Sequence, residues 1–97
     1  MKGHRLRILV TGAEGFIGKN LTVHLRAIKD IEVLTFNRNQ KLSDLSSLLT
    51  NTHWVIHLAG ANRPENPHDF FSINHKLTVF LCDAIRSTGR IIPIIFA

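Results

Sequence analysis

Short, continuous apolar runs alternate along the chain with longer segments in which apolar residues recur every three or four positions. Uninterrupted apolar runs are typical of parallel strands buried on both faces, whereas the longer spacing is typical of amphipathic helices. The predicted strands are 8–11, 31–36, 54–59 and 91–97. The predicted helices are 17–28, 44–49 and 69–87. Because strands that alternate with helices form right-handed βαβ units, we expect an α/β fold with a parallel sheet.

The expected sheet has the strand order 2-1-3-4, with the first strand central. This arrangement is the N-terminal half of a doubly wound Rossmann fold, flanked by helices. Ser43 is the expected N-cap of the short helix, and Gly89 is expected to stop the last one. Residues 60–67 form a loop, since their prolines and glycine interrupt both strand and helix. A further short strand between residues 36 and 45 stays open as an alternative.

Three glycines, Gly12, Gly15 and Gly18, lie between the first strand and the first helix. The first permits a tight turn, the second lets the backbone approach a pyrophosphate, and the third lets the helix pack against the strand. Amide groups at the start of the helix then face the phosphates, aided by the helix dipole. The three glycines follow a predicted strand and precede a predicted helix, and a second strand follows that helix. This context favours a dinucleotide site over a simple structural turn.

The end of the second strand bears on the choice of cofactor. An acidic residue there binds the ribose 2′-hydroxyl of NAD, whereas a nearby arginine accepts the 2′-phosphate of NADP. Asn37 replaces the acid, and Arg38 follows it. The sequence therefore favours NADP(H), with NAD(H) possible. The alternative is that Arg38 is only a solvated loop charge.

Length and composition limit the classes of function. The 97 residues suffice for one small domain, and 44% hydrophobic with 20% charged residues is typical of a soluble globular protein. The apolar runs are too short to span a membrane, so no membrane partner is expected. The net charge of +5 is spread along the chain, which argues against nucleic acid as a partner. The N-terminus lacks a signal peptide, and we expect a cytoplasmic protein.

Cysteine and histidine give little independent chemistry. Cys82 is the single cysteine, which excludes an internal disulfide, and its apolar neighbours predict a small core residue. The six histidines show no paired spacing with a carboxylate, so no metal site is expected. They are interpreted as surface or capping residues, with His57 pointing along a strand end.

Three segments resemble the extended short-chain dehydrogenase/reductase family, which contains nucleotide-sugar epimerases, dehydratases and reductases. Residues 11–18, TGAEGFIG, match the family's form of the glycine loop. Residues 57–60, HLAG, are similar to a family segment that lies along the cofactor. Asn74 resembles the helix asparagine that helps to hold the active-site backbone. The resemblance covers nearly all of the chain.

The segments GKNL at 18–21 and HLAGANRPEN at 57–66 resemble the capsule and O-antigen UDP-sugar reductases of UDP-N-acetyl-L-fucosamine synthesis. In those enzymes an NADPH-dependent reductase domain precedes a cupin-like epimerase domain. The resemblance implies reduction of a 4-keto-6-deoxy UDP-sugar, with Arg63 at the substrate diphosphate unless it is a solvated loop residue. The cofactor-binding residues that the motifs imply are Gly12, Gly15, Phe16, Ile17, Gly18, Asn37, Arg38, Leu58, Ala59 and Gly60.

Family members donate a proton from a tyrosine in a Y-x-x-x-K motif, and this sequence contains no tyrosine. We therefore expect 1–97 to be a truncated NAD(P)-binding domain with no catalytic residue of its own, inactive alone. Because the last strand would be an unpaired edge of a half sheet, we expect the fragment to expose apolar surface and to pair with another copy, as a homodimer, or to aggregate. The alternatives are an NAD-dependent epimerase or dehydratase of the same family, and a non-catalytic NADP(H)-binding module. Whether a tyrosine and a lysine follow Ala97 in the reading frame distinguishes the enzyme from the module.

Overall fold

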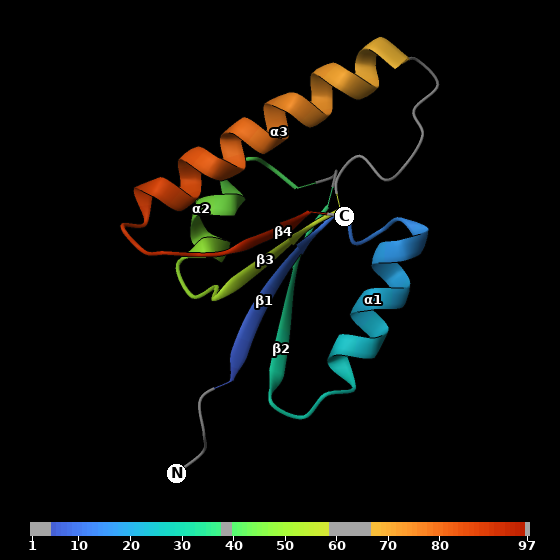
Figure 1. Cartoon of the computed structure of the whole chain (residues 1–97), viewed down its shortest axis with the longest axis vertical. Helices are drawn as coiled ribbons and strands as arrows, with labels where there is room; N and C mark the ends of the chain where they lie inside the picture. Colours follow the sequence, from blue (N-terminus) through green and yellow to red (C-terminus); the bar gives the residue numbers. More distant parts are fainter. Residues whose placement is uncertain (1–4, 38–39, 59–66, 97) are drawn as a thin grey trace.

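The computed structural model describes residues 5–37, 40–58 and 67–96, with side chains from 76 onwards in the last segment. The chain forms a parallel sheet with the strand order β2-β1-β3-β4, as the sequence predicts (Figure 1). The strands are β1 (Leu6–Thr11), β2 (Ile31–Phe36), β3 (Trp54–His57) and β4 (Ile94–Phe96). The helices are α1 (Phe16–Arg26), α2 (Asp44–Leu49) and α3 (Pro67–Ser87).

The strand register aligns the carboxyl ends of all the strands. Thr11 is paired with Phe36 of β2 on one side and with His57 of β3 on the other, and His57 is paired with Phe96 of β4. These residues form one row across the sheet. The segments that follow β1, β2 and β3 therefore leave the sheet at one edge, the place where open α/β sheets bind ligands.

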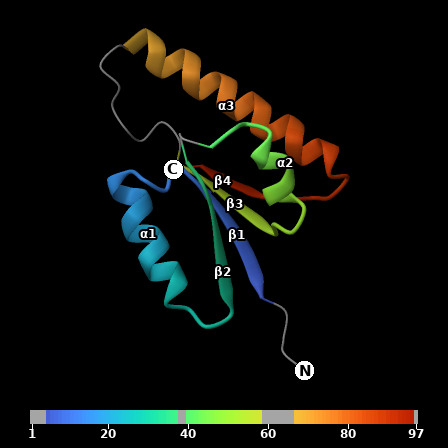
Figure 2. The same cartoon turned by 180° about the vertical axis from the view of Figure 1, so that it is seen from behind.

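Alternate residues of β1 face opposite layers, because successive strand side chains point to opposite sides. Leu9 belongs to a buried cluster with residues of α2 and α3, including Leu45 and Leu81. Ile8 and Val10 belong to a second cluster, against which Leu21 and Leu25 of α1 pack. Helix α1 thus covers one face of the sheet, and α2 and α3 cover the other (Figures 1 and 2).

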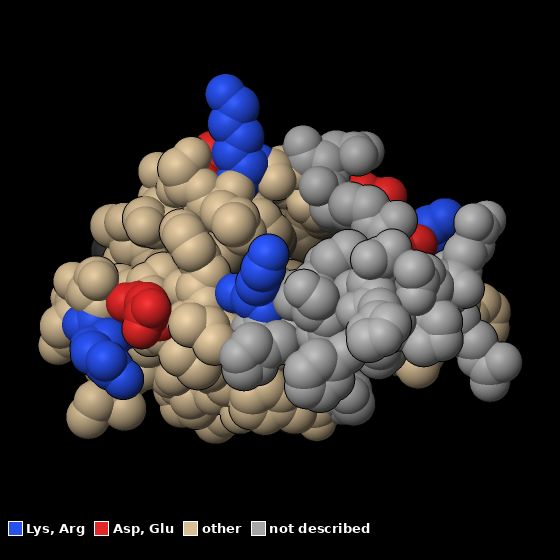
Figure 3. Space-filling view, turned by 90° about the horizontal axis from the view of Figure 1, so that it is seen from above, with Lys and Arg blue, Asp and Glu red and all other residues tan. Residues whose placement is uncertain are grey.

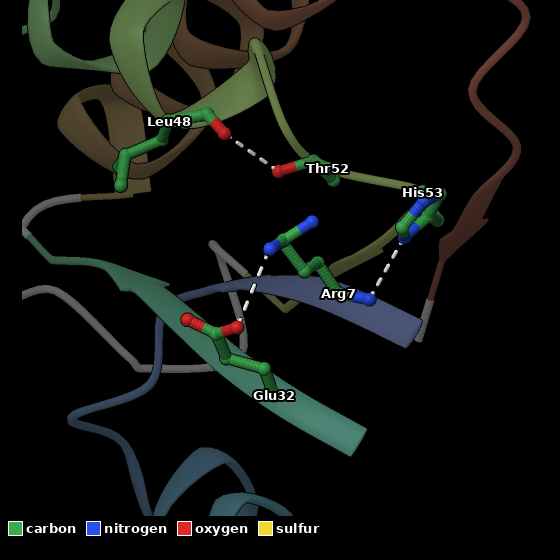
Figure 4. A network of polar contacts seen from close by, with 5 residues as sticks. All are labelled: Arg7, Glu32, Leu48, Thr52 and His53. Carbon is green, nitrogen blue, oxygen red and sulfur yellow. Dashed lines mark hydrogen bonds and ion pairs between the residues drawn. The ribbon is translucent and has the colours of Figure 1, made fainter. Parts of the chain in front are cut away.

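The amino-terminal edge of the sheet is joined by reciprocal polar contacts (Figure 4). The N–H of Arg7 donates to His53 Nδ1 at 2.9 Å, and the N–H of His53 donates to the carbonyl of Arg7 at 2.8 Å. The Arg7 guanidinium lies 3.3 Å from a Glu32 carboxylate oxygen. Thr52 Oγ1 donates to the carbonyl of Leu48 at 2.8 Å, at the end of α2. These contacts join β1 to β2 and to the start of β3.

Arg90 lies between α3 and β4 and bonds to the segment that joins α2 to β3. Its guanidinium donates to the carbonyls of Leu49 at 3.0 Å, Thr50 at 2.7 Å and Thr52 at 2.7 Å. The last carbonyls of a helix have no partner within the helix, and basic side chains satisfy them well. Arg90 therefore caps α2 and ties it to the turn before β4.

Ser43 occupies the N-cap position of α2, as expected, although its side chain makes no capping hydrogen bond; Asp44 Oδ2 accepts the N–H of Lys41 at 3.2 Å. Other local expectations differ from the structure. Cys82 is exposed, because it lies on the outer face of α3 next to the buried Leu81. Residues 40–44 form no strand, which decides the open alternative for that described part of the chain.

The last strand also differs from its expected form. The apolar run at 91–97 predicts a buried strand, yet β4 contains only Ile94–Phe96, and Ile91 is 96% exposed. Ile95 and Phe96 are exposed as well. The reason is that β4 is an edge strand in the described sheet, paired with β3 alone. Its apolar side chains are therefore not enclosed by a further strand among the described residues.

Candidate functional site

The turn after β1 requires glycine at its first position. Gly12 has a φ of 69°, a left-handed conformation that other residues adopt only with strain. Its N–H donates to the carbonyl of Phe36 at 3.1 Å, and its carbonyl accepts the N–H of Gly15 at 3.2 Å. The turn is therefore closed on itself and is tied to the end of β2.

Gly18 brings α1 against this turn. A Cβ on Gly18 would collide with the carbonyl oxygen of Gly12 and would lie 2.7 Å from the Cα of Ala13. Both neighbours are backbone atoms, which cannot rotate away as a side chain can. The close approach of helix and turn predicted from the glycine spacing is thus present in the structure.

The first turn of α1 is open to an anion. Gly15 is the N-cap with extended backbone, no side chain caps the helix, and no acidic residue occurs in the first turn. The first N–H groups of an α-helix have no acceptor within the helix, and its dipole favours negative charge. Phe16 and Ile17, the first two residues of the helix, are exposed, and the Phe16 side chain is 83% exposed. The exposed Glu14 precedes this turn.

His57 lies at the centre of a polar network between β1, β3 and α3. Its Nδ1 is 2.6 Å from Thr11 Oγ1, and its Nε2 is 3.0 Å from Thr78 Oγ1. The N–H of Leu58 also donates to Thr11 Oγ1 at 3.1 Å. The His57 ring is buried and meets Phe96 edge-on, with ring centroids 5.5 Å apart. The interpretation of His57 as a surface or capping residue is therefore wrong.

Burial lowers the pKa of His57 from its ordinary value of 6.5, because a charged imidazolium loses its hydration there. In the neutral form the ring can accept a hydrogen bond from the Thr11 hydroxyl at Nδ1 and donate one from Nε2 to the Thr78 hydroxyl. This network fixes the ends of β1 and β3 against α3. Sequence reasoning missed Thr11 and Thr78, since both are ordinary residues of a strand and a helix.

Asn37 follows β2 at the same edge. Its Oδ1 is buried and has no hydrogen-bond partner among the described residues. Its N–H donates to Gln40 Oε1 at 2.8 Å, and its carbonyl accepts the N–H of Gln40 at 3.0 Å. A buried acceptor without a partner is costly, so this oxygen is a candidate to accept a hydrogen bond from a ligand. The sequence analysis did not single out Gln40.

The structure brings together the predicted residues that it describes. Because their segments follow β1, β2 and β3, these residues share the carboxyl edge of the sheet: Gly12, Gly15, Phe16, Ile17, Gly18, Asn37 and Leu58. Arg38, Ala59, Gly60 and Arg63 lie outside the described residues, as does the side chain of Asn74. Figure 3 looks onto this end of the molecule, and the basic and acidic side chains coloured there are scattered, not gathered into one patch.

Comparison with known proteins places the chain in a family. The model of the NAD dependent epimerase/dehydratase family matches residues 8–97. The chain belongs to this family. The resemblance indicated by the glycine loop is therefore confirmed.

Relatives in the family include sugar-nucleotide enzymes. The chain is 45% identical over 91 residues to UDP-2-acetamido-2,6-beta-L-arabino-hexul-4-ose reductase of Pseudomonas aeruginosa, covering 94% of this chain but 24% of that protein. The crystal structure of UDP-N-acetylglucosamine 4-epimerase from Bacillus cereus has a TM-score of 0.67 and 28% identity, covering 94% of this chain and 34% of that one. The capsular polysaccharide assembling protein CapF from Staphylococcus aureus has a TM-score of 0.51 and 25% identity, covering 92% and 29%.

The described residues fit the dinucleotide that the family name implies. The left-handed Gly12 and the tight Gly18 contact let the backbone of the turn come close to a ligand. The first turn of α1 carries no acidic side chain that would repel a pyrophosphate. The unpartnered Asn37 Oδ1 offers an acceptor where the adenosine ribose lies in folds of this kind.

No described helix is long and apolar enough to cross a membrane. The described residues also contain no group of three His, Cys, Asp or Glu that could hold a metal ion. Among the described residues, the carboxyl edge offers a ligand the backbone amides at the start of α1 and the Asn37 side chain.

Proposed function

We propose that this chain is the NADP(H)-binding part of a nucleotide-sugar reductase that reduces a 4-keto-6-deoxy UDP-sugar in capsule or O-antigen synthesis. The 45% identity to a UDP-hexulose reductase carries the proposal. The chain spans about a quarter of that relative's length, 24%, so the activity of a whole enzyme is part of the proposal. A cytoplasmic location and a homodimer go with it.

The proposed cofactor site follows the carboxyl edge of the sheet. The backbone from Gly12 to Gly18 cradles the pyrophosphate at the start of α1. Asn37 and Arg38 contact the adenosine ribose and its 2′-phosphate, and 58–60 lies along the cofactor. When bound, the cofactor supplies the hydride for the reduction. Arg63 is proposed to contact the substrate diphosphate.

Calorimetric titration of the protein with NADPH and with NADH tests the cofactor. We expect both to bind, with NADPH binding more tightly, because Arg38 follows β2 and no acidic residue occupies position 37 to repel the 2′-phosphate. Arg38→Ala should weaken NADPH binding and leave NADH binding nearly unchanged. Tighter binding of NADH by the unaltered protein contradicts the NADP(H) assignment, and binding of neither contradicts the cofactor site.

A second candidate is an epimerase that uses tightly held NAD. The structural similarity to UDP-N-acetylglucosamine 4-epimerase, with a TM-score of 0.67, favours it. Product analysis of the full-length gene product, incubated with NADPH and a 4-keto-6-deoxy UDP-sugar, distinguishes the two. A reductase consumes one NADPH for each 4-hydroxy sugar formed, whereas an epimerase interconverts sugar epimers with no net consumption of cofactor.

A further inference from the structure

Gln40 holds the backbone of Asn37 through a reciprocal pair of hydrogen bonds. The side-chain Oε1 of Gln40 accepts the Asn37 N–H at 2.8 Å, and the Gln40 N–H donates to the Asn37 carbonyl at 3.0 Å. Both backbone polar groups of Asn37 are thus bonded to one residue. Of these two bonds, only the one through Oε1 depends on the identity of the side chain at position 40.

The residue before Asn37 is fixed as well. The carbonyl of Phe36 accepts the N–H of Gly12 at 3.1 Å, and the Phe36 side chain is buried in the cluster under α2 and α3. Asn37 therefore starts from a fixed strand end and is held from the other side by Gln40. The backbone that carries the Asn37 side chain is constrained in relation to the glycine turn.

The unpartnered oxygen of the Asn37 side chain is the observation that indicates a ligand. Asn37 Oδ1 is buried without a partner among the described residues, although a buried amide oxygen normally accepts a hydrogen bond. A ribose hydroxyl can donate to this oxygen. If the amide turns over, its two N–H donors can instead meet a phosphate oxygen. Either contact requires the Asn37 backbone to be ordered in the complex.

We propose that Gln40 is a positioning residue that fixes Asn37 for contact with the adenosine ribose of the dinucleotide, an inference that rests on the proposed cofactor site. Gln40 acts through Asn37 and does not itself touch the cofactor. Without Oε1, the Asn37 N–H bonds to water and the backbone gains freedom that binding must remove again. Ordering the residue in advance therefore increases affinity.

A double-mutant cycle on the full chain tests this coupling. Gln40→Met keeps the length of the side chain and removes the acceptor, and Asn37→Ala removes the ligand-facing amide. Each single change should raise the calorimetric Kd for NADPH and NADH by about 2- to 12-fold, the range expected for one hydrogen bond. The double variant should bind no more weakly than Asn37→Ala alone, since Gln40 then has nothing left to position.

Gln40→Glu is the matched control, because its carboxylate still accepts the Asn37 N–H. It is measured with NADH, which lacks the 2′-phosphate that an added negative charge would repel, and it should bind within about twofold of the unaltered protein. Gln40→Ala is a second variant without the acceptor, and thermal unfolding checks that all variants are folded.

Three results overturn the role of Gln40 while the cofactor site stands: an unchanged Kd for Gln40→Met, additive losses in the double variant, or equal losses for Gln40→Glu and Gln40→Met with NADH. If the unaltered protein binds neither dinucleotide, the cofactor site fails and the role of Gln40 fails with it. Dinucleotide binding by the unaltered protein therefore distinguishes failure of the Gln40 role from failure of the cofactor site.

Discussion

The two ends of the sheet use their polar groups differently. At the amino end, Arg7 bonds both His53 and Glu32, and Arg90 caps the carbonyls at the end of α2. At the carboxyl end, the first turn of α1 has no side-chain cap, and the buried Asn37 Oδ1 has no partner among the described residues. The polar groups named at the amino end are thus bonded to other groups of the chain. The carboxyl end leaves the start of α1 without a side-chain cap and one buried acceptor without a partner among the described residues, and open α/β sheets bind their ligands at this edge.

This contrast predicts that substitutions at the amino end change stability alone, whereas those at the carboxyl end change ligand binding as well. Residues of the same type occur at both ends, so the prediction can be tested with matched variants. Natural α/β proteins concentrate binding at the carboxyl ends of their strands, because the segments that leave those ends converge there.

The largest effect is expected for Gly18→Ala. The added Cβ would lie 2.7 Å from the Cα of Ala13 and would collide with the carbonyl of Gly12, so the helix must move away from the turn. We expect the free energy of unfolding to fall by about 1–3 kcal/mol, the usual cost of overpacking, and NADPH affinity to fall by at least about tenfold. Urea denaturation and calorimetry measure the two quantities.

Val23→Ala is the control for this change, since Val23 lies on the outer face of α1 and is 65% exposed. It should alter the free energy of unfolding by less than about 0.5 kcal/mol and leave NADPH binding unchanged. Unaltered NADPH affinity in Gly18→Ala would contradict the proposed contact between the turn and the pyrophosphate.

Arg90→Ala tests the amino end. It removes the guanidinium that bonds the carbonyls of Leu49, Thr50 and Thr52, and we expect the free energy of unfolding to fall by about 2 kcal/mol. The dinucleotide Kd should not change. Arg86→Ala is the control: its guanidinium is exposed and lies 4.0 Å from Asp83, a pair worth less than about 1 kcal/mol. Weaker dinucleotide binding in folded Arg90→Ala would show that the two ends are coupled.

Gly12→Ala and Gly89→Ala form the most closely matched pair. Gly12 has a φ of 69° at the carboxyl end, and Gly89 has a φ of 71° after α3 at the amino end. Each alanine should cost about 1 kcal/mol of stability through backbone strain, and only Gly12→Ala should weaken dinucleotide binding as well. Equal loss of dinucleotide binding in both variants would contradict the assignment of binding to the carboxyl end alone.

The smallest expected effect is a pH dependence from His57. Burial lowers its pKa below 6.5, so between the lowered value and 6.5 the unfolded chain binds more protons than the folded one. The free energy of unfolding should therefore rise with pH across this window, by at most about 1.4 kcal/mol per pH unit for one group. His57→Asn should reduce that slope, as followed by urea denaturation at several pH values. An identical slope in the two proteins would contradict the buried, neutral ring.

Much of the fold was predictable because local patterns carry it. Apolar runs locate β1 and β2, and helical spacing locates α1 and α3, so the strand order follows from the general rules for βαβ units. The exposure of β4 was expected from its place at the edge of a half sheet. The exposure of Cys82 was not predictable from its apolar neighbours, because which face of a helix is covered depends on what packs beside it.

The candidate site divides along the same line. The spacing of Gly12, Gly15 and Gly18 predicts a close turn from sequence alone, since only glycine permits a left-handed φ and a helix lying directly on backbone atoms. Asn37 was identified by its place after the second strand. By contrast, Gln40 has no apolar period or motif to mark it, and its side-chain bond to Asn37 is visible only in three dimensions.

The amino-acid sequence by itself determined the order of strands and helices, the glycine turn and the family, because each depends on residues close together in the chain. Only the tertiary structure decided the partners of His57 and Arg90. The strand register sets His57 beside Thr11, 46 residues earlier, and the return of the chain after α3 brings Arg90 to Leu49, 41 residues earlier. Contacts over such separations arise from the packing of whole elements, and no local pattern records them.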